Sequence, residues 1–66
     1  MKERKIKLRV KFNKLLDHTA TVMEKYAMGE LSNKEMECEL DYIDSMMMDI
    51  NAETAVIQLL DTVGVN

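Results

Sequence analysis

Few side chains in this sequence could take part in catalysis or metal binding, and they are isolated from one another. The single histidine, His18, lies between Asp17 and Thr19. An imidazole beside a carboxylate could act as a general base or as a metal ligand. However, no second histidine and no cysteine stands at ligand spacing from it. We therefore predict that His18 is a surface or interface residue.

The single cysteine, Cys38, lies between Glu37 and Glu39. Their negative charges disfavour a thiolate, which is the reactive form of the side chain. The acidic residues around it lack the alternating Asp/Asn pattern with a central glycine that a calcium loop needs. We predict an inert cysteine on a solvated helical face. The sequence thus predicts no catalytic residue, no metal site and no cofactor, and the chain is not expected to be an enzyme.

Charge is sorted strongly along the chain. Residues 1–14 contain seven bases and one acid, whereas residues 15–66 contain two bases and eleven acids, for a net charge of −3. Such a basic arm could contact phosphate or another anion, and the candidate side chains are Lys5, Lys7, Arg9 and Lys11. The alternative is that the arm pairs with the acidic part of a neighbouring subunit.

Two helices are predicted on either side of Gly29. The first has an apolar series with steps of three and four, formed by Phe12, Leu15, Thr19, Val22 and Tyr26. Gly29 would end it as a left-handed cap. Ser32 and Glu35 form a capping-box pattern that would begin the second helix. The inner series expected there is Met36, Leu40, Ile43, Met47 and Ile50. The short linker predicts an antiparallel hairpin.

A short third helix is expected after the second. The second stripe loses register near Asn51, which would cap a new helix at Ala52 and Glu53. Its expected inner face is formed by Ala52, Val56, Leu59, Leu60 and Val63, and Gly64 would end it. With neither a repeat nor a second apolar unit, residues 1–66 are predicted to form a single small, mainly α-helical domain.

The sequence leaves residues 4–12 open between two structures. Basic and apolar residues alternate from Lys5 to Phe12, which is typical of a half-buried strand. As a helix, the same residues would extend the first helix but would leave Ile6 and Val10 exposed. As a strand, they would need a partner strand in a second molecule, and so would pair across a dimer.

In its strand form, this arrangement resembles the ribbon-helix-helix repressors. The features that carry the resemblance are the alternating segment from Lys5 to Phe12, a helix, the turn Gly29–Ser32 and a helix opening at Asn33. The resemblance implies a dimer whose paired strands read the major groove through Lys5, Lys7, Arg9 and Lys11. The sequence departs from the family at Glu35 and Glu37, where members usually carry uncharged or basic groups.

A chain of 66 residues buries a smaller fraction of its surface on folding than a larger domain does, so we expect its free energy of unfolding to be small. One cysteine cannot form an internal disulfide, so oligomerisation is the expected supplement. Three consecutive methionines, Met46–Met48, cannot all face one small core, because they span about 200° of a helix. The apolar residues expected at an oligomer or partner interface are Ile6, Val10, Met46 and Met48.

Together these features predict a cytoplasmic, non-enzymatic protein–protein interaction module. No apolar run approaches the length of a bilayer span, and no apolar stretch follows the basic start, as a secretory signal would require. The chain would act as a homo-oligomer and regulate or inhibit a larger macromolecule, a class common in mobile genetic elements. One alternative is a ribbon-helix-helix-like DNA-binding transcriptional regulator. The other is an oligomer that sequesters an anionic small ligand.

Overall fold

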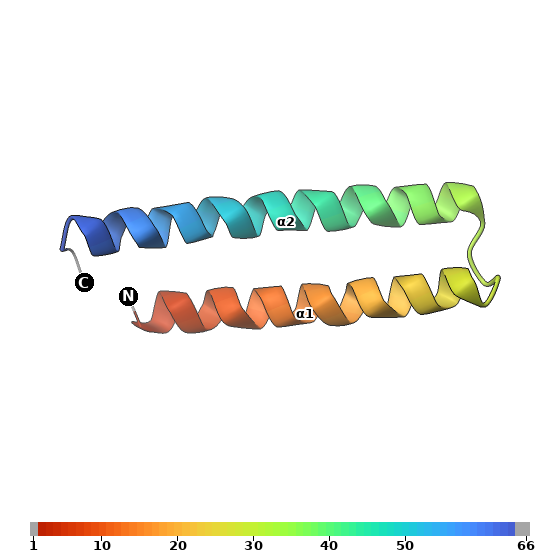
Figure 1. Ribbon diagram of the computed structural model, residues 1–66, viewed down its shortest axis with the longest axis horizontal. Coiled ribbons are helices and arrows are strands. Elements are labelled where there is room, and N and C mark those ends of the chain that lie inside the picture. The colour runs from red at the N-terminus through yellow and green to blue at the C-terminus, as the bar shows by residue number, and fades with distance from the viewer. Residues whose placement is uncertain (1, 65–66) are drawn as a thin grey trace.

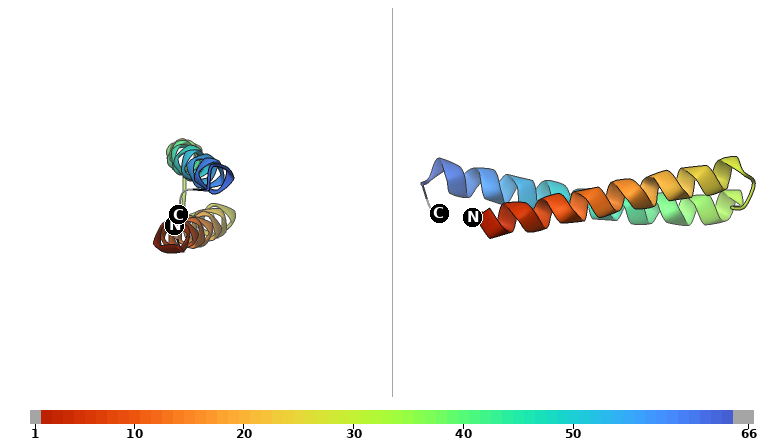
Figure 2. Two further views of the ribbon diagram at one scale, coloured as in Figure 1. Left: turned by 90° about the vertical axis from the view of Figure 1, so that its left-hand side faces the viewer. Right: turned by 90° about the horizontal axis from the view of Figure 1, so that it is seen from below.

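The fold is a hairpin of two long antiparallel α-helices (Figure 1). The computed structural model describes residues 2–64, with α1 at Lys2–Ala27 and α2 at Asn33–Thr62. A turn at residues 28–32 joins them. The end-on view shows the two helices side by side, and the view from below shows that they cross at a shallow angle (Figure 2). The predicted mainly α-helical hairpin is confirmed.

The turn forms as the local sequence predicts. Gly29 has φ +77°, and its amide donates to the Tyr26 carbonyl at 3.1 Å, while the Glu30 amide donates to the Lys25 carbonyl at 2.8 Å. This is the hydrogen-bond pattern of a left-handed glycine cap. The capping box is also present, because Ser32 and Glu35 each accept from the other's amide at 3.1 Å. The turn thus satisfies the backbone groups at the ends of both helices.

The helices meet along a seam with a seven-residue repeat. From α1, Leu8, Leu15 and Val22 face α2. Their counterparts on α2 are Met36, Ile43, Ile50 and Ile57. Such a repeat holds one narrow stripe of each helix against the other, as in a coiled coil. The buried apolar side chains of residues 2–64 are Leu15, Val22, Ile50 and Ile57, which are 4–6% exposed.

The predicted third helix is wrong, because α2 continues without a break through Asn51 to Thr62. The segment from Asn33 to Thr62 contains neither glycine nor proline, and one asparagine is a mild cost inside a helix. The seam also keeps its register across this point, from Ile50 to Ile57. Val56, Leu59 and Val63, which were expected inside, are 39%, 63% and 61% exposed.

The inner faces predicted for the first two helices included residues that the structure leaves exposed. Phe12 and Tyr26 of α1 are 39% and 43% exposed, and Leu40 of α2 is 51% exposed. Each residue advances about 100° around a helix, so a partner helix covers only the seam positions. These three side chains lie beside the seam.

Residues 4–12 are helical, and residues 2–64 contain no strand. The sequence allowed a helix or a strand here, and the structure has the helix. Ile6 and Val10 are exposed, as we expected for the helical alternative. The paired ribbon of the ribbon-helix-helix fold is absent from this part of the chain. Ion pairs with α2 hold the segment in place instead, through Arg4, Lys5 and Lys11.

The hairpin is too elongated to enclose a core. Its principal extents are 49 × 16 × 11 Å and its radius of gyration is 15.4 Å. A compact domain of this length would have a radius of gyration of about 11 Å. The elongated shape leaves the sides of both helices open to further packing.

The seam carries the folding free energy, so truncating it should unfold the chain. We expect Ile50→Ala to cost about 2 to 5 kcal/mol, because it removes a buried side chain and leaves a cavity. The control is Leu59→Ala, which truncates an exposed residue of the same helix and should change stability little. Urea unfolding followed by circular dichroism measures both. Equal losses would show that the seam is misplaced.

The turn should depend on the conformation of Gly29. An added β-carbon would meet nothing within 4 Å, so the cost of Gly29→Ala comes from the backbone alone. We expect a loss of about 1 kcal/mol in the free energy of unfolding. Gly29→Asn should lose less, since asparagine tolerates positive φ. If the melting temperature of Gly29→Ala equals or exceeds that of the wild type, Gly29 does not have a left-handed conformation.

Candidate functional site

Three of the seven bases in residues 1–14 are paired with acids of α2. Three ion pairs and one histidine–carboxylate contact join the helices, and all are partly exposed, so each ion pair contributes at most about 1 kcal/mol. They are Arg4–Glu53 at 2.6 Å, Lys5–Asp61 at 3.1 Å, Lys11–Asp49 at 3.5 Å and His18–Glu39 at 2.8 Å. Arg4, Lys5 and Lys11 therefore have carboxylate partners within their own chain.

The four bases predicted to contact an anion do not share one surface. Lys7 and Lys11 border a hollow of about 370 Å³ on one side of the seam, together with Arg4 and the carboxylates of Glu3 and Glu53. Lys5 and Arg9 border a larger hollow, of about 520 Å³, on the other side. Lys5 and Lys11 are also paired with acids of α2. The structure thus divides the four predicted side chains between two sides of the seam.

His18 forms a polar contact between the helices. Its Nε2 lies 2.8 Å from Oε2 of Glu39, and its ring meets the edge of Tyr42 at 5.2 Å. Cys38 is exposed. Within residues 2–64, no three His, Cys, Asp or Glu side chains gather in a way that could hold a metal ion. His18 therefore orients α1 against α2 at its place in the fold.

The strongest local electrostatic effect is at the start of α2. The Ser32 amide donates to the carboxylate of Glu35, and the Ser32 hydroxyl accepts from the Glu35 backbone amide. Hydrogen bonding to the carboxylate, first from the backbone of Ser32 and then from its side chain, favours the ionised form and lowers the pKa of Glu35 below its ordinary value of 4.5. The carboxylate is thus fixed in its ionised form as part of the cap.

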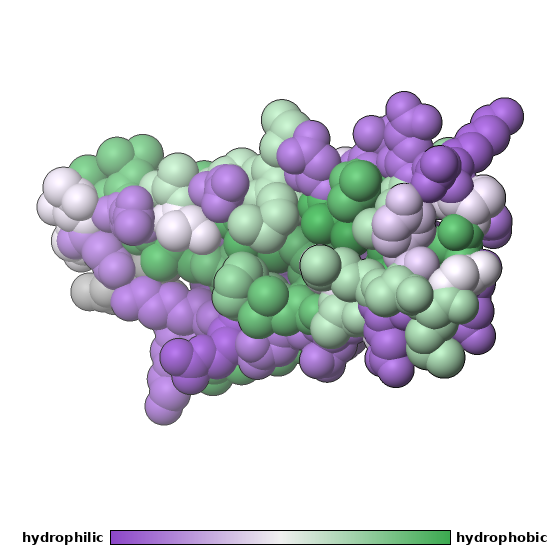
Figure 3. Space-filling model, turned by 45° about the vertical axis from the view of Figure 1, so that its right-hand side comes forward, coloured by the Kyte–Doolittle hydropathy of each residue, from purple (hydrophilic) through white to green (hydrophobic). Residues whose placement is uncertain are grey.

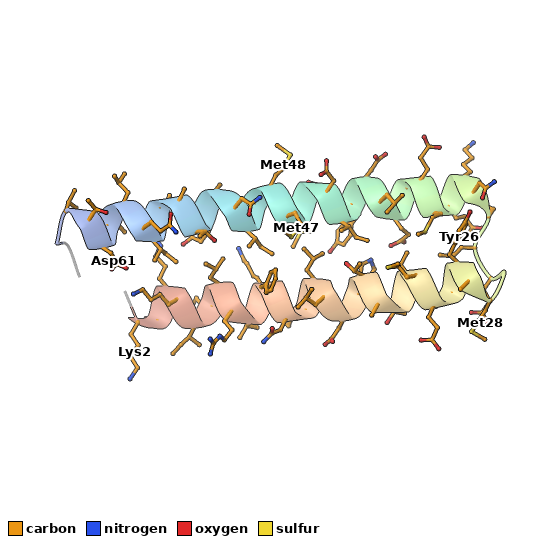
Figure 4. The ribbon with its side chains drawn as sticks, viewed as in Figure 1. Lys2, Tyr26, Met28, Met47, Met48 and Asp61 are labelled. Carbon is orange, nitrogen blue, oxygen red and sulfur yellow. The ribbon has the colours of Figure 1, made fainter. Side chains whose placement is uncertain are left out.

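The apolar residues predicted at an interface are exposed in large part, but they do not form one surface. Ile6 and Val10 project from the side of α1 away from α2. Met48 projects from the opposite side of the hairpin, away from α1, whereas its neighbour Met47 lies toward the seam (Figure 4). Met46 lies at the seam with Lys14, Tyr42 and other residues.

A larger apolar surface lies along one side of the seam, and we call it the apolar face. Its exposed members are Phe12, Leu16, Met23, Tyr26 and Leu40, and Met36 and Met47 are half-buried beside them. Phe12 and Met47 line the 520 Å³ hollow, so the surface crosses from α1 to α2. Figure 3 shows hydrophobic residues gathered over both helices in the middle of this side.

The sequence of α1 contains a pattern that indicates the apolar face. We predicted a single apolar stripe on this helix, and so did not predict that face. Phe12, Leu16, Met23 and Tyr26 are spaced for one helical side, next to the repeat that contains Leu15 and Val22. Two adjacent stripes make α1 apolar over too wide an arc for one partner helix. That width is typical of a helix packed against two neighbours.

A second apolar strip follows the outer side of α2. Its exposed large residues are Met48, Val56, Leu59 and Val63, and Ala52 lies among them at helical spacing. Apart from Met48, these residues were predicted to lie on the inner face of a third helix. We call this strip the outer strip of α2.

Comparison of the chain with protein-family models, with curated proteins and with solved structures finds no match. Between residues 2 and 64, neither α1 nor α2 has a segment long and apolar enough to cross a membrane. Function must therefore be inferred from the surfaces themselves.

The cap at Glu35 makes a pH-dependent prediction. The pKa of Glu35 is lower in the folded chain than in the unfolded chain. The stability that its carboxylate contributes is therefore present above pH 4.5 and is lost as pH falls through the folded pKa. Glu35→Gln keeps an accepting oxygen but cannot ionise. We expect the wild type to melt higher than this variant at pH 7, and the difference to vanish toward pH 2. A difference constant with pH would contradict the assigned cap.

Proposed function

We propose that this chain is a non-enzymatic protein–protein interaction module that associates with itself and regulates or inhibits a larger macromolecule. The observation that carries the proposal is the imbalance between buried and exposed apolar residues. Within residues 2–64, thirteen large hydrophobic side chains are exposed and four apolar side chains are buried. Exposed apolar surface of this extent is typical of a site at which another chain binds.

The accessible surface supports the same proposal. The hairpin exposes 5277 Å². A compact monomer of 7.6 kDa would expose about 4,300 Å², so the excess is about 1,000 Å². A standard protein interface covers about 800 Å² on each partner. The excess is therefore what one interface per subunit would remove.

Two separate apolar surfaces suit a module that binds both itself and another protein. The apolar face spans both helices, as an association surface between hairpins would. The outer strip of α2 is on a different side and has no charged residue among Met48, Ala52, Val56, Leu59 and Val63. It can stay accessible in an oligomer, and a larger partner protein could use it.

Self-association is tested by light scattering at about 20 μM protein in 0.1 M NaCl. We expect a mass of at least twice 7.6 kDa, with cooperative thermal unfolding whose midpoint rises with protein concentration. A cooperatively folded monomer with a concentration-independent midpoint would overturn the proposal.

The DNA-binding alternative is tested in the same buffer at lower salt. Titration with arbitrary duplex DNA should give no salt-sensitive binding, because the candidate bases lie on two sides of the hairpin and two of them are paired. Binding that weakens steeply with salt would instead favour a nucleic-acid function.

A further inference from the structure

The apolar face lacks the helices that would cover it. In α1, Leu8, Leu15 and Val22 are used by the contact with α2, and Phe12, Leu16 and Met23 lie on the adjacent side. α2 presents Leu40 and Met47 to the same side. Helices with two adjacent apolar stripes are the components of four-helix bundles, in which each helix packs against two neighbours. One hairpin supplies two of the four helices.

Charge is distributed unevenly along the 49 Å length of the hairpin. The half that contains the turn, residues 15–45, has eight acids and two bases, for a charge of −6. The half at the open end, residues 1–14 and 46–66, has seven bases and four acids, for a charge of +3. Folding the chain into a hairpin therefore produces a particle with oppositely charged ends.

We propose that the apolar face is covered by a second copy of this chain, related by a two-fold axis and running antiparallel to the first. This inference rests on the proposed self-association and specifies its surface and its orientation. In the antiparallel arrangement centred on the apolar face, the acidic turn end of each copy lies at the level of the basic residues near Arg9 of the other. A parallel arrangement would place the two −6 ends together, which opposes association.

A two-fold arrangement on this face is self-consistent. Such an interface uses the same patch on both subunits, and the apolar face contains residues of both α1 and α2. Its aromatic and methionine side chains, including Phe12, Tyr26 and Met23, are types enriched in interfaces. The excess accessible surface of the hairpin also matches the area that one such interface covers.

The surface is tested by placing a charge in it. At 20 μM, Leu16→Glu and Leu40→Glu should each raise the dissociation constant at least about 100-fold, since each would bury an unpaired carboxylate. Leu59→Glu is the matched control, because it places the same charge on an exposed leucine of the outer strip. It should leave the mass unchanged. If Leu59→Glu dissociates the dimer and Leu16→Glu does not, the surface is wrongly assigned.

The orientation is tested on dimers that retain the whole apolar face. A spin label at Glu30→Cys in a Cys38→Ser background lies at the turn. In the antiparallel dimer, the two labels should be about 30 Å apart or more, because about eleven residues of helix at 1.5 Å each separate the turn from the centre of the face on both copies. A separation under about 20 Å, within two helix diameters, would show a parallel dimer.

Salt gives an independent test of the charge argument, because it requires no substitution. Between 0.05 and 0.5 M NaCl, the dissociation constant of the wild-type dimer should rise as the attraction between opposite ends is screened. A parallel dimer would show the opposite sign, since salt would relieve its repulsion. A dissociation constant that falls with salt would overturn the antiparallel arrangement.

The outcomes separate this inference from the proposed function. A wild-type monomer at 20 μM overturns both. A wild-type dimer that survives both glutamate substitutions in the apolar face leaves self-association standing and overturns the assigned surface. A dimer that Leu16→Glu disrupts, but whose turn labels lie close together, keeps the surface and overturns the orientation.

Discussion

The constraint on which the rest of the structure depends is that two helices can bury only one narrow stripe of each other. Leu15 and Val22 meet the repeat that contains Ile50 and Ile57, and these four side chains are the buried ones among residues 2–64. Because each helix turns about 100° per residue, apolar residues one step from the seam stay in contact with water. The hairpin thus has a well-defined contact and an incomplete core.

Electrostatics complements this contact without replacing it. The ion pairs from Arg4, Lys5 and Lys11 to α2 are partly exposed, so they align the helices more than they stabilise them. Their arrangement also determines the charge of each end of the molecule. Most acids lie near the turn and most bases lie near the open end. The separation of charge along the sequence therefore gives the two ends of the hairpin opposite net charges. That polarity is the basis of the antiparallel association that we propose.

The hollows beside the seam are open to solvent. His18 is occupied by Glu39 and Tyr42 from the facing helix. What the hairpin offers to other molecules is extended apolar surface on more than one side.

The sequence by itself determined the two helices and the turn, because these depend on local signals. Gly29 and the Ser32–Glu35 capping box act within a few residues, and both are found as predicted. Tertiary structure alone decided which apolar residues are inside. Leu40 and Val56 fit an inner stripe by spacing, yet the position of the other helix leaves both exposed. It also decided that α2 passes through Asn51 and that residues 4–12 are helical, since the contact with the facing helix overrides weak local preferences.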